Sequence, residues 1–279
     1  MSFDDLLNEK IDLLPASDTR EAMRYSLLAG GKRIRPRLLY ETVKGYGKEE
    51  HLADDFACAI EMIHTYSLIH DDLPAMDKDD LRRGKPTCHR QLNEAIAILA
   101  GDGLLTYAFE TASKSRLDSA VVQKCISILS MAAGAGGMVL GQNLDIEEGE
   151  HPVDWNALKK IHHYKTGCLL AAPLMMGAVI AGQDDDTVKR WEQIGYTIGL
   201  AFQVQDDILD VELSAEEFGK SNSDERNDKV TSVTLLGIEE AEHQMHVLYG
   251  SAADAIRQEK GFDSTALSDL LNRIENRRK

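Results

Sequence analysis

The stretch that best indicates the fold class is LADDFACAIEMIHTYSLIHDDLPAMDKDD, residues 52–80. Its apolar residues recur at helical spacing, among them Phe56, Ile60 and Ile63. The pattern stops at Leu73-Pro74, where proline removes a backbone donor. We therefore expect a helix over residues 52–70 that ends directly before a run of aspartates.

The same helical periodicity continues along the rest of the chain. Asp18 and Glu21 resemble a capping box, and a run of alternating strand residues is missing. Further helices are expected over residues 93–112, 119–133, 154–165, 167–183 and 187–209, and from Thr231 to the C-terminus. The chain shows no repeat and no low-complexity linker. These patterns predict an all-α fold, with residues 1–279 as one domain and with sites built from inward-facing side chains.

The charge balance limits the possible partners. The chain has 47 acidic and 31 basic residues, which gives a net charge of −16. Nucleic acids and anionic membrane surfaces are polyanions, so we expect neither as a partner. If the substrate is itself acidic, local cations or metal ions must reverse the charge at the site.

Cysteine use and hydropathy predict a cytoplasmic protein without an integral membrane segment. The four cysteines are widely spaced and form no CxxC pair, which is typical of small buried residues in a reducing compartment. Residues 1–10 are acidic and lack the apolar stretch of a secretory signal. The longest uncharged run, residues 167–183, contains Pro173 and is short for a membrane span, so we expect a buried central helix there.

The first acidic cluster predicts a metal site. Residues 70–80 contain five aspartates where an apolar helix ends, namely Asp71, Asp72, Asp77, Asp79 and Asp80. Like charges repel unless a cation compensates them, and Mg²⁺ takes one or two carboxylates while it leaves places for phosphate oxygens. Arg82 and Arg83 follow at once, and arginine suits bidentate phosphate binding. The alternative interpretation is a solvated acidic loop.

A second cluster lies within an otherwise apolar helix. Asp206 and Asp210 share a helix face, and Asp207 lies one turn before Asp210. Flanking residues such as Ile208 and Leu209 make a solvent-facing stripe a poor explanation, although exposed charges at a helix end remain the alternative. If the two clusters face one another, they can hold several Mg²⁺ ions around one diphosphate.

Motifs distributed over most of the chain resemble the polyprenyl synthase family, in particular its short-chain bacterial members. They are Gly30-Gly31-Lys32-Arg33-Ile34-Arg35-Pro36, the run from His64 to Gly84, Gly141-Gln142-Asn143-Leu144-Asp145, Lys165-Thr166-Gly167, the Asp206 cluster, and Gly219-Lys220. They occur in the family's order. The spacing from Asp71-Asp72 to Asp77, with Pro74 between them, resembles the bacterial short-chain form of the first motif.

The resemblance implies an all-α isoprenoid synthase-type bundle around a deep central cavity. It also implies a Mg²⁺-dependent head-to-tail condensation of isopentenyl diphosphate with dimethylallyl or geranyl diphosphate, which gives farnesyl diphosphate plus diphosphate. Three Mg²⁺ ions are implied, held by Asp71, Asp77 and Asp206, with Asp72, Asp207 and Asp210 in support. A homodimer is implied by the family and by no pattern in this chain.

The substrate contacts are likewise carried over from the resemblance. Isopentenyl diphosphate is assigned to Lys32, Arg35, His64 and Arg83. The allylic substrate is assigned to Arg82, Lys165, Thr166, Gln203, Lys220 and Lys229. In this interpretation Asp71, Asp72, Asp77, Lys165, Thr166, Gln203 and Asp206 are the catalytic set. Without the motif, His64 is an ordinary core histidine, and Lys32 and Arg35 are surface cations.

Two residues before the first cluster predict the product length. Tyr66 and Ser67 lie five and four residues before Asp71, on the helix expected to line the cavity. A bulky Tyr66 should stop elongation near C15, and a small Ser67 leaves room for more than C10. Farnesyl diphosphate is therefore the expected product, with geranyl diphosphate as the alternative. Tyr66 as a packed core aromatic is compatible with this role.

The chain departs from the family after Gly219-Lys220. Residues 221–233 lack the Tyr-Pro element that usually follows, although Lys229 keeps a suitable position. The terminal Arg277-Arg278-Lys279 resembles a basic tail that helps to close some farnesyl synthases, with a solvated terminus as the alternative. A non-catalytic subunit, a terpene cyclase and a metal-dependent phosphohydrolase remain open, and a condensation assay separates them from a synthase.

Overall fold

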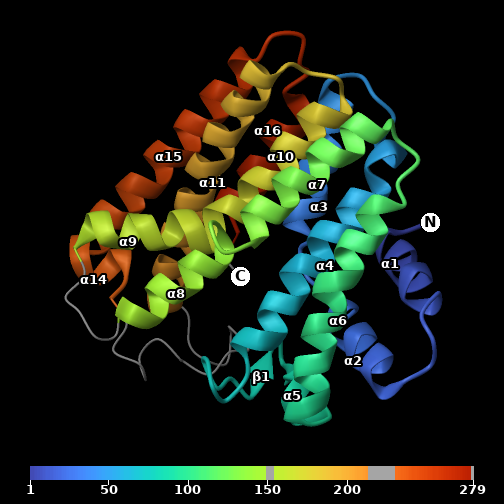
Figure 1. Ribbon diagram of the computed structural model, residues 1–279. Helices are drawn as coiled ribbons and strands as arrows, with labels where there is room; N and C mark the ends of the chain where they lie inside the picture. Colours follow the sequence, from blue (N-terminus) through green and yellow to red (C-terminus); the bar gives the residue numbers. More distant parts are fainter. Residues whose placement is uncertain (149–153, 213–229, 278–279) are drawn as a thin grey trace.

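A computed structural model describes residues 1–148, 154–212 and 230–277, and within them the chain is almost entirely helical (Figure 1). The α-helices are α1 Phe3–Asp12, α2 Asp18–Leu27, α3 Ile34–Gly45, α4 Asp54–Asp71, α5 Cys88–Gln91, α6 Glu94–Ser113, α7 Ser119–Ala133, α8 Met138–Glu148, α9 Trp155–His162, α10 Cys168–Ile180, α11 Asp185–Glu212, α14 Ser232–Leu236, α15 Ile238–Gln258 and α16 Thr265–Glu275. A 3₁₀ turn, Glu50–Ala53, precedes α4, and a π-helix, His163–Gly167, joins α9 to α10. The predicted all-α fold is confirmed.

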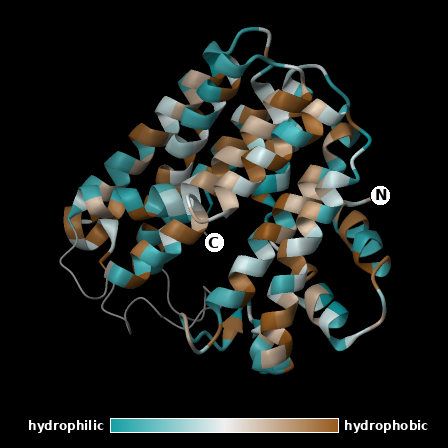
Figure 2. Ribbon diagram, viewed as in Figure 1, coloured by the Kyte–Doolittle hydropathy of each residue, from teal (hydrophilic) through white to brown (hydrophobic). Residues whose placement is uncertain are grey.

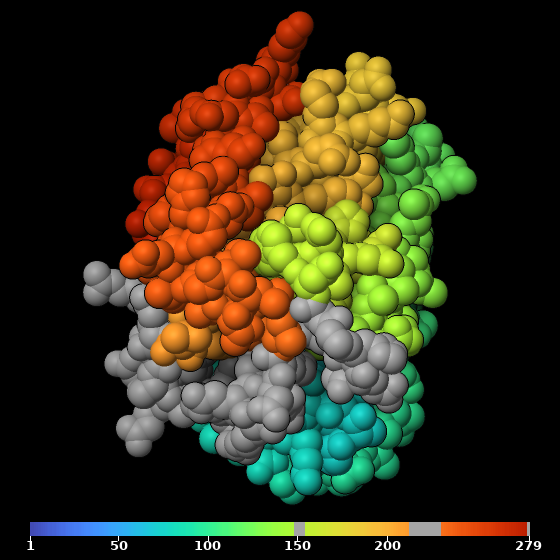
Figure 3. Space-filling model, turned by 90° about the vertical axis from the view of Figure 1, so that its left-hand side faces the viewer, coloured from blue at the N-terminus to red at the C-terminus, as the bar shows by residue number. Residues whose placement is uncertain are grey.

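The expected central helix is confirmed as α10. Every residue of α10 except Met175 is buried, and its neighbours are α3, α7 and α11. In turn, α4 packs on α6, and α15 lies along α11 at the surface (Figures 1 and 3). Polar and apolar residues alternate in bands along the outer helices (Figure 2). Each outer helix therefore buries one face and exposes the other.

Helix starts follow the capping residues closely. Asp154 accepts a hydrogen bond from the Ala157 amide at 2.8 Å, as expected for the cap of α9. The prediction of Asp18 as a cap is wrong by one residue. Ser17 is the extended N-cap of α2 and accepts from the Arg20 amide at 3.1 Å, and Asp18 is the first helical residue. Aspartate is favourable there because the helix dipole is positive at its N-terminus.

One short hairpin interrupts the helical pattern. β1 Leu81–Arg82 pairs antiparallel with β2 Lys85–Pro86, so that Arg82 lies opposite Lys85. The two-residue turn between them has positive φ at both positions, 53° at Arg83 and 72° at Gly84. This is the geometry of a type I′ turn, which needs left-handed backbone at both central residues. The sequence analysis expected no strands, because two-residue strands are too short to show alternation.

Two helical stretches are long and apolar enough to span a membrane by length and composition, namely Glu94–Ser113 and Ser119–Glu147. Of their most apolar windows, 44% and 39% respectively are buried within the chain. A helix that packs against the core of a protein outside a membrane can pass the same test of length and composition. Several apolar side chains of these helices are exposed, namely Ile98 and Leu99 on α6, Met131 on α7 and Val139 on α8.

Candidate active site

The first acidic cluster is folded back on itself where α4 ends. The amide of Asp77 donates to the carbonyl of Asp71 at 2.9 Å, and the amide of Lys78 donates to the carbonyl of Leu73 at 3.1 Å. This turn leaves the helix at Pro74 and returns Asp77 to the end of α4. The two outer aspartates that the sequence analysis paired, Asp71 and Asp77, are thus brought together.

The surroundings of Asp71 disfavour the charged form of its carboxyl group. Burial raises the pKa of Asp71 to about 6, Asp77 and Asp72 also raise it, and Lys165 and Arg82 lower it. The carboxylate accepts a hydrogen bond from Gln142 on α8. The C-terminal end of α4 adds its own partial negative charge. A divalent cation relieves this crowding, so the residues present fit a metal ion at this position.

The Asp72 carboxylate is paired with Arg82 of the hairpin. Its side chain is 4% exposed, and Oδ1 accepts from Arg82 through Nε at 2.7 Å and Nη2 at 2.6 Å. Burial raises the pKa of Asp72, and this effect outweighs the opposing effect of Arg82. The bidentate pair anchors β1 to the end of α4. The structure therefore places Asp72 as the residue that orients Arg82.

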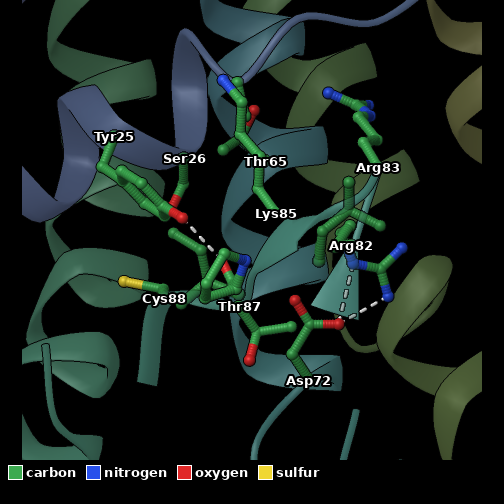
Figure 4. A pocket seen from close by; sticks show the side chains of 13 residues that line it. Tyr25, Ser26, Thr65, Asp72, Arg82, Arg83, Lys85, Thr87 and Cys88 are labelled. Carbon is green, nitrogen blue, oxygen red and sulfur yellow. Dashed lines mark hydrogen bonds and ion pairs between the residues drawn. The ribbon is translucent and has the colours of Figure 1, made fainter. Parts of the chain in front are cut away.

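A small pocket lies beneath the hairpin (Figure 4). Tyr25 closes one side and donates from its hydroxyl to the carbonyl of Pro86 at 2.7 Å. Asp72 and Arg82 lie at the other side, joined by their ion pair. The contacts with α2 and α4 fix the hairpin and hence both arginines at its turn.

A group of cations lies on the opposite side of Arg82. Arg83 donates to the carbonyl of Gly30, and a Cβ on Gly31 would lie 2.8 Å from its guanidinium. The φ of Gly31 is +134°, which favours glycine there, whereas the flexible Arg83 side chain could move away from a Cβ. The Gly-Gly turn thus brings the 30–36 segment against Arg83, and Lys32 lies exposed in the same loop.

Arg35 and His64 form the floor of this cationic group. Burial lowers the pKa of Arg35 to about 10, against the opposing effects of Glu61 and Asp206. Within the part of the chain that the structure describes, Arg35 Nε is buried without a hydrogen-bond partner. Burial, then Arg35 and Arg83, lower the pKa of His64 well below its usual range, so His64 is neutral. A buried guanidinium N–H that lacks an acceptor fits an anionic ligand.

The π-helix positions the next predicted pair. Residues His163–Gly167 form the π-helix that contains Lys165 and Thr166, and such bulges occur frequently at functional sites. Lys165 Nζ donates to Asp145 Oδ2 of α8 at 2.6 Å. Thr166 Oγ1 donates to Gln203 Oε1 of α11 at 2.7 Å. Three elements thus meet around Lys165 and Thr166.

Close backbone approach makes this meeting possible. A Cβ at Gly141 of α8 would lie 2.0 Å from the Lys165 nitrogen. A Cβ at Gly199 of α11 would lie 2.5 Å from the Gly167 Cα. Glycine is therefore the residue that lets α8 and α11 approach the π-helix closely enough for these side chains to bond.

The second cluster separates into three environments along α11. Asp206 accepts from Arg277 Nη2 at 2.6 Å. Asp207 is buried, accepts from the Ser232 amide at 2.7 Å, and lies 3.8 Å from His162 Nε2. Asp210 is partly exposed near the end of the helix. The three aspartates therefore differ in role, although they are adjacent in sequence.

Sequence reasoning assigned no role to several residues of the site. Gln142 and Asp145 lie three apart on α8, so one helix face reaches both Asp71 and Lys165. They stood inside a quoted motif, and this spacing was the available signal. Ser232 and Arg277 reach the second cluster from distant sequence. No local pattern points to Ser232, and Arg277 was singled out only as part of the basic C-terminal tail, without a link to Asp206.

Other predicted residues are placed as follows. Tyr66 and Ser67 are both buried on α4; Tyr66 packs edge-on against His70, and Ser67 donates to the His64 carbonyl at 2.9 Å. Lys220 and Lys229 lie outside the described residues. Across residues 1–148, 154–212 and 230–277, no three His, Cys, Asp or Glu side chains converge as a ready metal cage. That is compatible with Mg²⁺, which uses few protein carboxylates.

The comparisons with known proteins cover nearly the whole chain. The sequence profile of the polyprenyl synthetase family matches residues 17–262. The farnesyl diphosphate synthase of Micrococcus luteus is 45% identical over 282 residues, which cover 99% of this chain and 96% of that protein. The chloroplastic geranylgeranyl pyrophosphate synthase 7 of Arabidopsis thaliana is 44% identical over 272 residues, covering 96% and 78%. The geranyltransferase of Helicobacter pylori, solved with magnesium and isoprenyl diphosphate, superposes with a TM-score of 0.84 at 34% identity over 98% of this chain and 95% of that chain.

Proposed function

Because the chain belongs to the polyprenyl synthetase family, we propose that it is a short-chain trans-prenyl diphosphate synthase. It joins isopentenyl diphosphate to dimethylallyl or geranyl diphosphate and makes farnesyl diphosphate, with geranyl diphosphate as the alternative product. The observation that carries this proposal is the buried Arg35 guanidinium, which lacks an acceptor at Nε in the described part of the chain, beside neutral His64 and Arg83. An acidic protein that builds such a group binds a polyanion there.

We assign Mg²⁺ to Asp71, Asp77 and Asp206, with three ions per site and with Asp72, Asp207 and Asp210 in support. Raised pKa and crowding at Asp71 support a divalent cation there. When bound, Mg²⁺ neutralises the allylic diphosphate and makes it a better leaving group. The carboxylates of Asp72 and Asp207 serve mainly through the partners that they orient, Arg82 and the Ser232 amide.

The protein's own side chains hold both substrates in reacting positions. Lys32, Arg35, His64 and Arg83 bind isopentenyl diphosphate, and Arg82 and Lys165 bind the allylic diphosphate. Lys220 and Lys229 are assigned to the same allylic group by resemblance. Asp145 supports this arrangement because it orients Lys165 through their 2.6 Å contact. Two diphosphates held by separate cationic groups keep the two carbon chains side by side.

The bond changes balance as follows. The C–O bond of the allylic substrate breaks, and its electron pair leaves with diphosphate. The isopentenyl double bond forms the new C–C bond to the allylic carbon, and the departing diphosphate takes the proton whose loss restores the double bond. We assign stabilisation of the allylic cation to the side-chain oxygens of Thr166 and Gln203, which are hydrogen-bonded to one another at 2.7 Å.

We assign the product length to Tyr66 and Ser67. Tyr66 is large and buried five residues before Asp71, so it blocks a chain that grows along α4. Tyr66→Ala should therefore lengthen the product, and chain-length analysis of the extracted isoprenoids measures the effect. A variant that still makes C15 alone would remove Tyr66 from this role. Ser67→Ala is the matched control, because it changes volume little.

Exposed apolar side chains on α6, α7 and α8 support a homodimer. Leu99 and Met131 are 51% and 72% exposed, and Ile98 and Val139 are also exposed. Burying such residues against a second copy is favourable. We also interpret residues 1–279 as one polyprenyl synthase domain that acts in the cytoplasm, without a nucleic-acid partner and without an integral membrane segment.

Condensation by the purified protein tests the function. Labelled isopentenyl diphosphate is supplied with Mg²⁺ and either dimethylallyl or geranyl diphosphate, and the products are separated by chain length. A C15 product that disappears with a chelator is the expected result. Failure with both starters, from folded protein, overturns the synthase proposal and favours a non-catalytic subunit. Arg35→Met should raise the KM for isopentenyl diphosphate more than that for the allylic substrate.

A further inference from the structure

The C-terminal arginine is built into the second aspartate cluster. Arg277 Nη2 contacts Asp206 Oδ1 at 2.6 Å and also lies 3.3 Å from the Phe202 carbonyl. The two residues are 71 positions apart in sequence. The Arg277 side chain is 8% exposed, whereas Asp206 is 29% exposed. Arg277 is therefore packed, whereas Arg278 and Lys279 lie outside the described residues.

Several further groups contact or support the Arg277 side chain. Arg277 Nε donates to Gln205 Oε1 at 2.9 Å, and the Tyr249 hydroxyl donates to the same oxygen at 2.9 Å. Gln205 is fixed in turn, because its amide donates to the Glu275 carbonyl at 2.6 Å. The Arg277 guanidinium lies 3.7 Å above the centre of the Phe202 ring. Stacking and fork geometry both select arginine over lysine here.

Electrostatics explain why a cation belongs at this position. Asp206, Asp207 and Asp210 lie near the C-terminal end of α11, where the helix dipole is also negative. In a chain of net charge −16, such a cluster is costly without a compensating cation. Arg277 lies just beyond the end of α16 and supplies that charge. Among the described residues, Asp206 makes its ion pair through Oδ1 alone.

We propose that Arg277 is the internal counter-ion of Asp206 and competes with Mg²⁺ for it. This rests on the proposed function, in which Asp206 binds metal. In the metal-free enzyme Arg277 holds the carboxylate and keeps its own position against α11. Binding of the metal ion displaces the guanidinium from Oδ1. Loading of the second aspartate cluster is thereby coupled to the position of the C-terminal residues.

Metal titration of charge-neutral variants tests the competition. Arg277→Met removes the charge and keeps an apolar side chain over Phe202. Arg273→Met is the matched control, because Arg273 is exposed on α16 and bonds only the Asp269 carbonyl among the described residues. Thermal unfolding is followed as Mg²⁺ is raised in the presence of constant inorganic diphosphate. This readout needs no turnover.

The expected result has two parts. Without metal, Arg277→Met melts at a lower temperature than Arg273→Met, because Asp206 has lost its partner. With metal, its half-saturating Mg²⁺ concentration is about fivefold lower, as for a competing ion pair of ordinary strength. Arg277→Lys, which keeps the charge, should restore part of the wild-type Mg²⁺ requirement. An unchanged or raised Mg²⁺ requirement in Arg277→Met overturns the proposal.

Measurements in an Asp206→Asn background test whether Arg277 acts through Asp206. Condensation by the wild type tests the proposed reaction separately. If Arg277 acts through Asp206, Arg277→Met should no longer change the Mg²⁺ midpoint in that background. A shift of the same size there refutes competition at Asp206. Absence of prenyl condensation by the wild type, with the Mg²⁺ shifts intact, would refute only the proposed reaction. Normal condensation without the shifts would refute only the role of Arg277.

Discussion

A methyl group at Gly141 should damage the site without removing any side chain that is proposed to bind substrate. The added Cβ would lie 2.0 Å from the Lys165 nitrogen, 2.4 Å from its Cα and 2.6 Å from the Tyr164 carbonyl carbon. All three atoms belong to backbone, so no side chain can turn away. Ordinary contact begins at 3.4 Å. Gly141→Ala must therefore push α8 and the π-helix apart by about 1 Å or more.

The expected loss of stability and activity in Gly141→Ala depends on the interactions that cross the contact between α8 and the π-helix. Overpacking of this kind costs about 1–3 kcal/mol, which for a chain of this length lowers Tm by roughly 2–12 °C. The Asp145–Lys165 and Gln142–Asp71 bonds both cross from α8 to its neighbours, so both are displaced together. Misplacement of catalytic groups by 1 Å lowers activity by about 100-fold. We expect the loss mainly in kcat.

The assay compares Gly141→Ala with Gly250→Ala. Gly250 also lies within a helix, α15, but a Cβ there meets nothing within 4 Å. Gly250→Ala should keep full activity and gain about 0.5–1 kcal/mol of stability, because alanine favours helix. Steady-state condensation and thermal unfolding are measured for both variants. Gly141→Ala with wild-type Tm and kcat would show that α8 does not set the position of Lys165.

Three further predictions follow from other parts of the structure. His64 has a folded-state pKa below its usual 6.5, so the unfolded chain takes up its proton first and wild-type stability falls as pH drops below that value. His64→Gln should lose less stability than the wild type between about pH 7 and pH 5.5 in urea unfolding, and equal slopes would contradict this. Asp207→Ala leaves the Ser232 amide without its acceptor and should cost about 1–3 kcal/mol, whereas Asp207→Asn should recover most of this in the same measurement. Leu99→Glu should convert a dimer to a monomer in sedimentation, with exposed Ser251→Glu on α15 as the control; a dimeric Leu99→Glu protein would exclude this part of α6 from the dimer contact.

Most helices were predictable because their signals are local. The 119–133 helix has the expected bounds, and the 93–112 helix is shifted by one residue at each end. Within the 167–183 segment the helix Cys168–Ile180 is buried as expected, because a long run without charges favours the core, whereas Gly182 is exposed. Aspartates at the end of α4 were visible because helix period, proline and charge change within a few residues.

The parts of the site that the sequence did not predict depend on contacts between residues far apart in the chain. No local sequence pattern marks such contacts. The π-helix at His163–Gly167 continues an ordinary helical pattern, and only packing against Gly141 and Gly199 reveals it. Asp206 and Asp207 look equivalent in sequence. Their partners, Arg277 and Ser232, lie 71 and 25 residues away, so their different roles follow only from tertiary structure.

In both aspartate clusters a protein cation offsets the repulsion between carboxylates, but the two cations come from different parts of the chain. Each lies near the C-terminal end of a helix, α4 or α11, where the dipole adds to the negative charge. At α4 an arginine only ten residues away, Arg82, binds the buried Asp72, whereas the pKa of Asp71 stays raised. At α11 the arginine comes from the end of the chain and binds Asp206 itself. Under the proposed competition, the first cluster is the better site for early metal binding, and the second would become fully available only when Arg277 leaves, which would order the loading of the two sides.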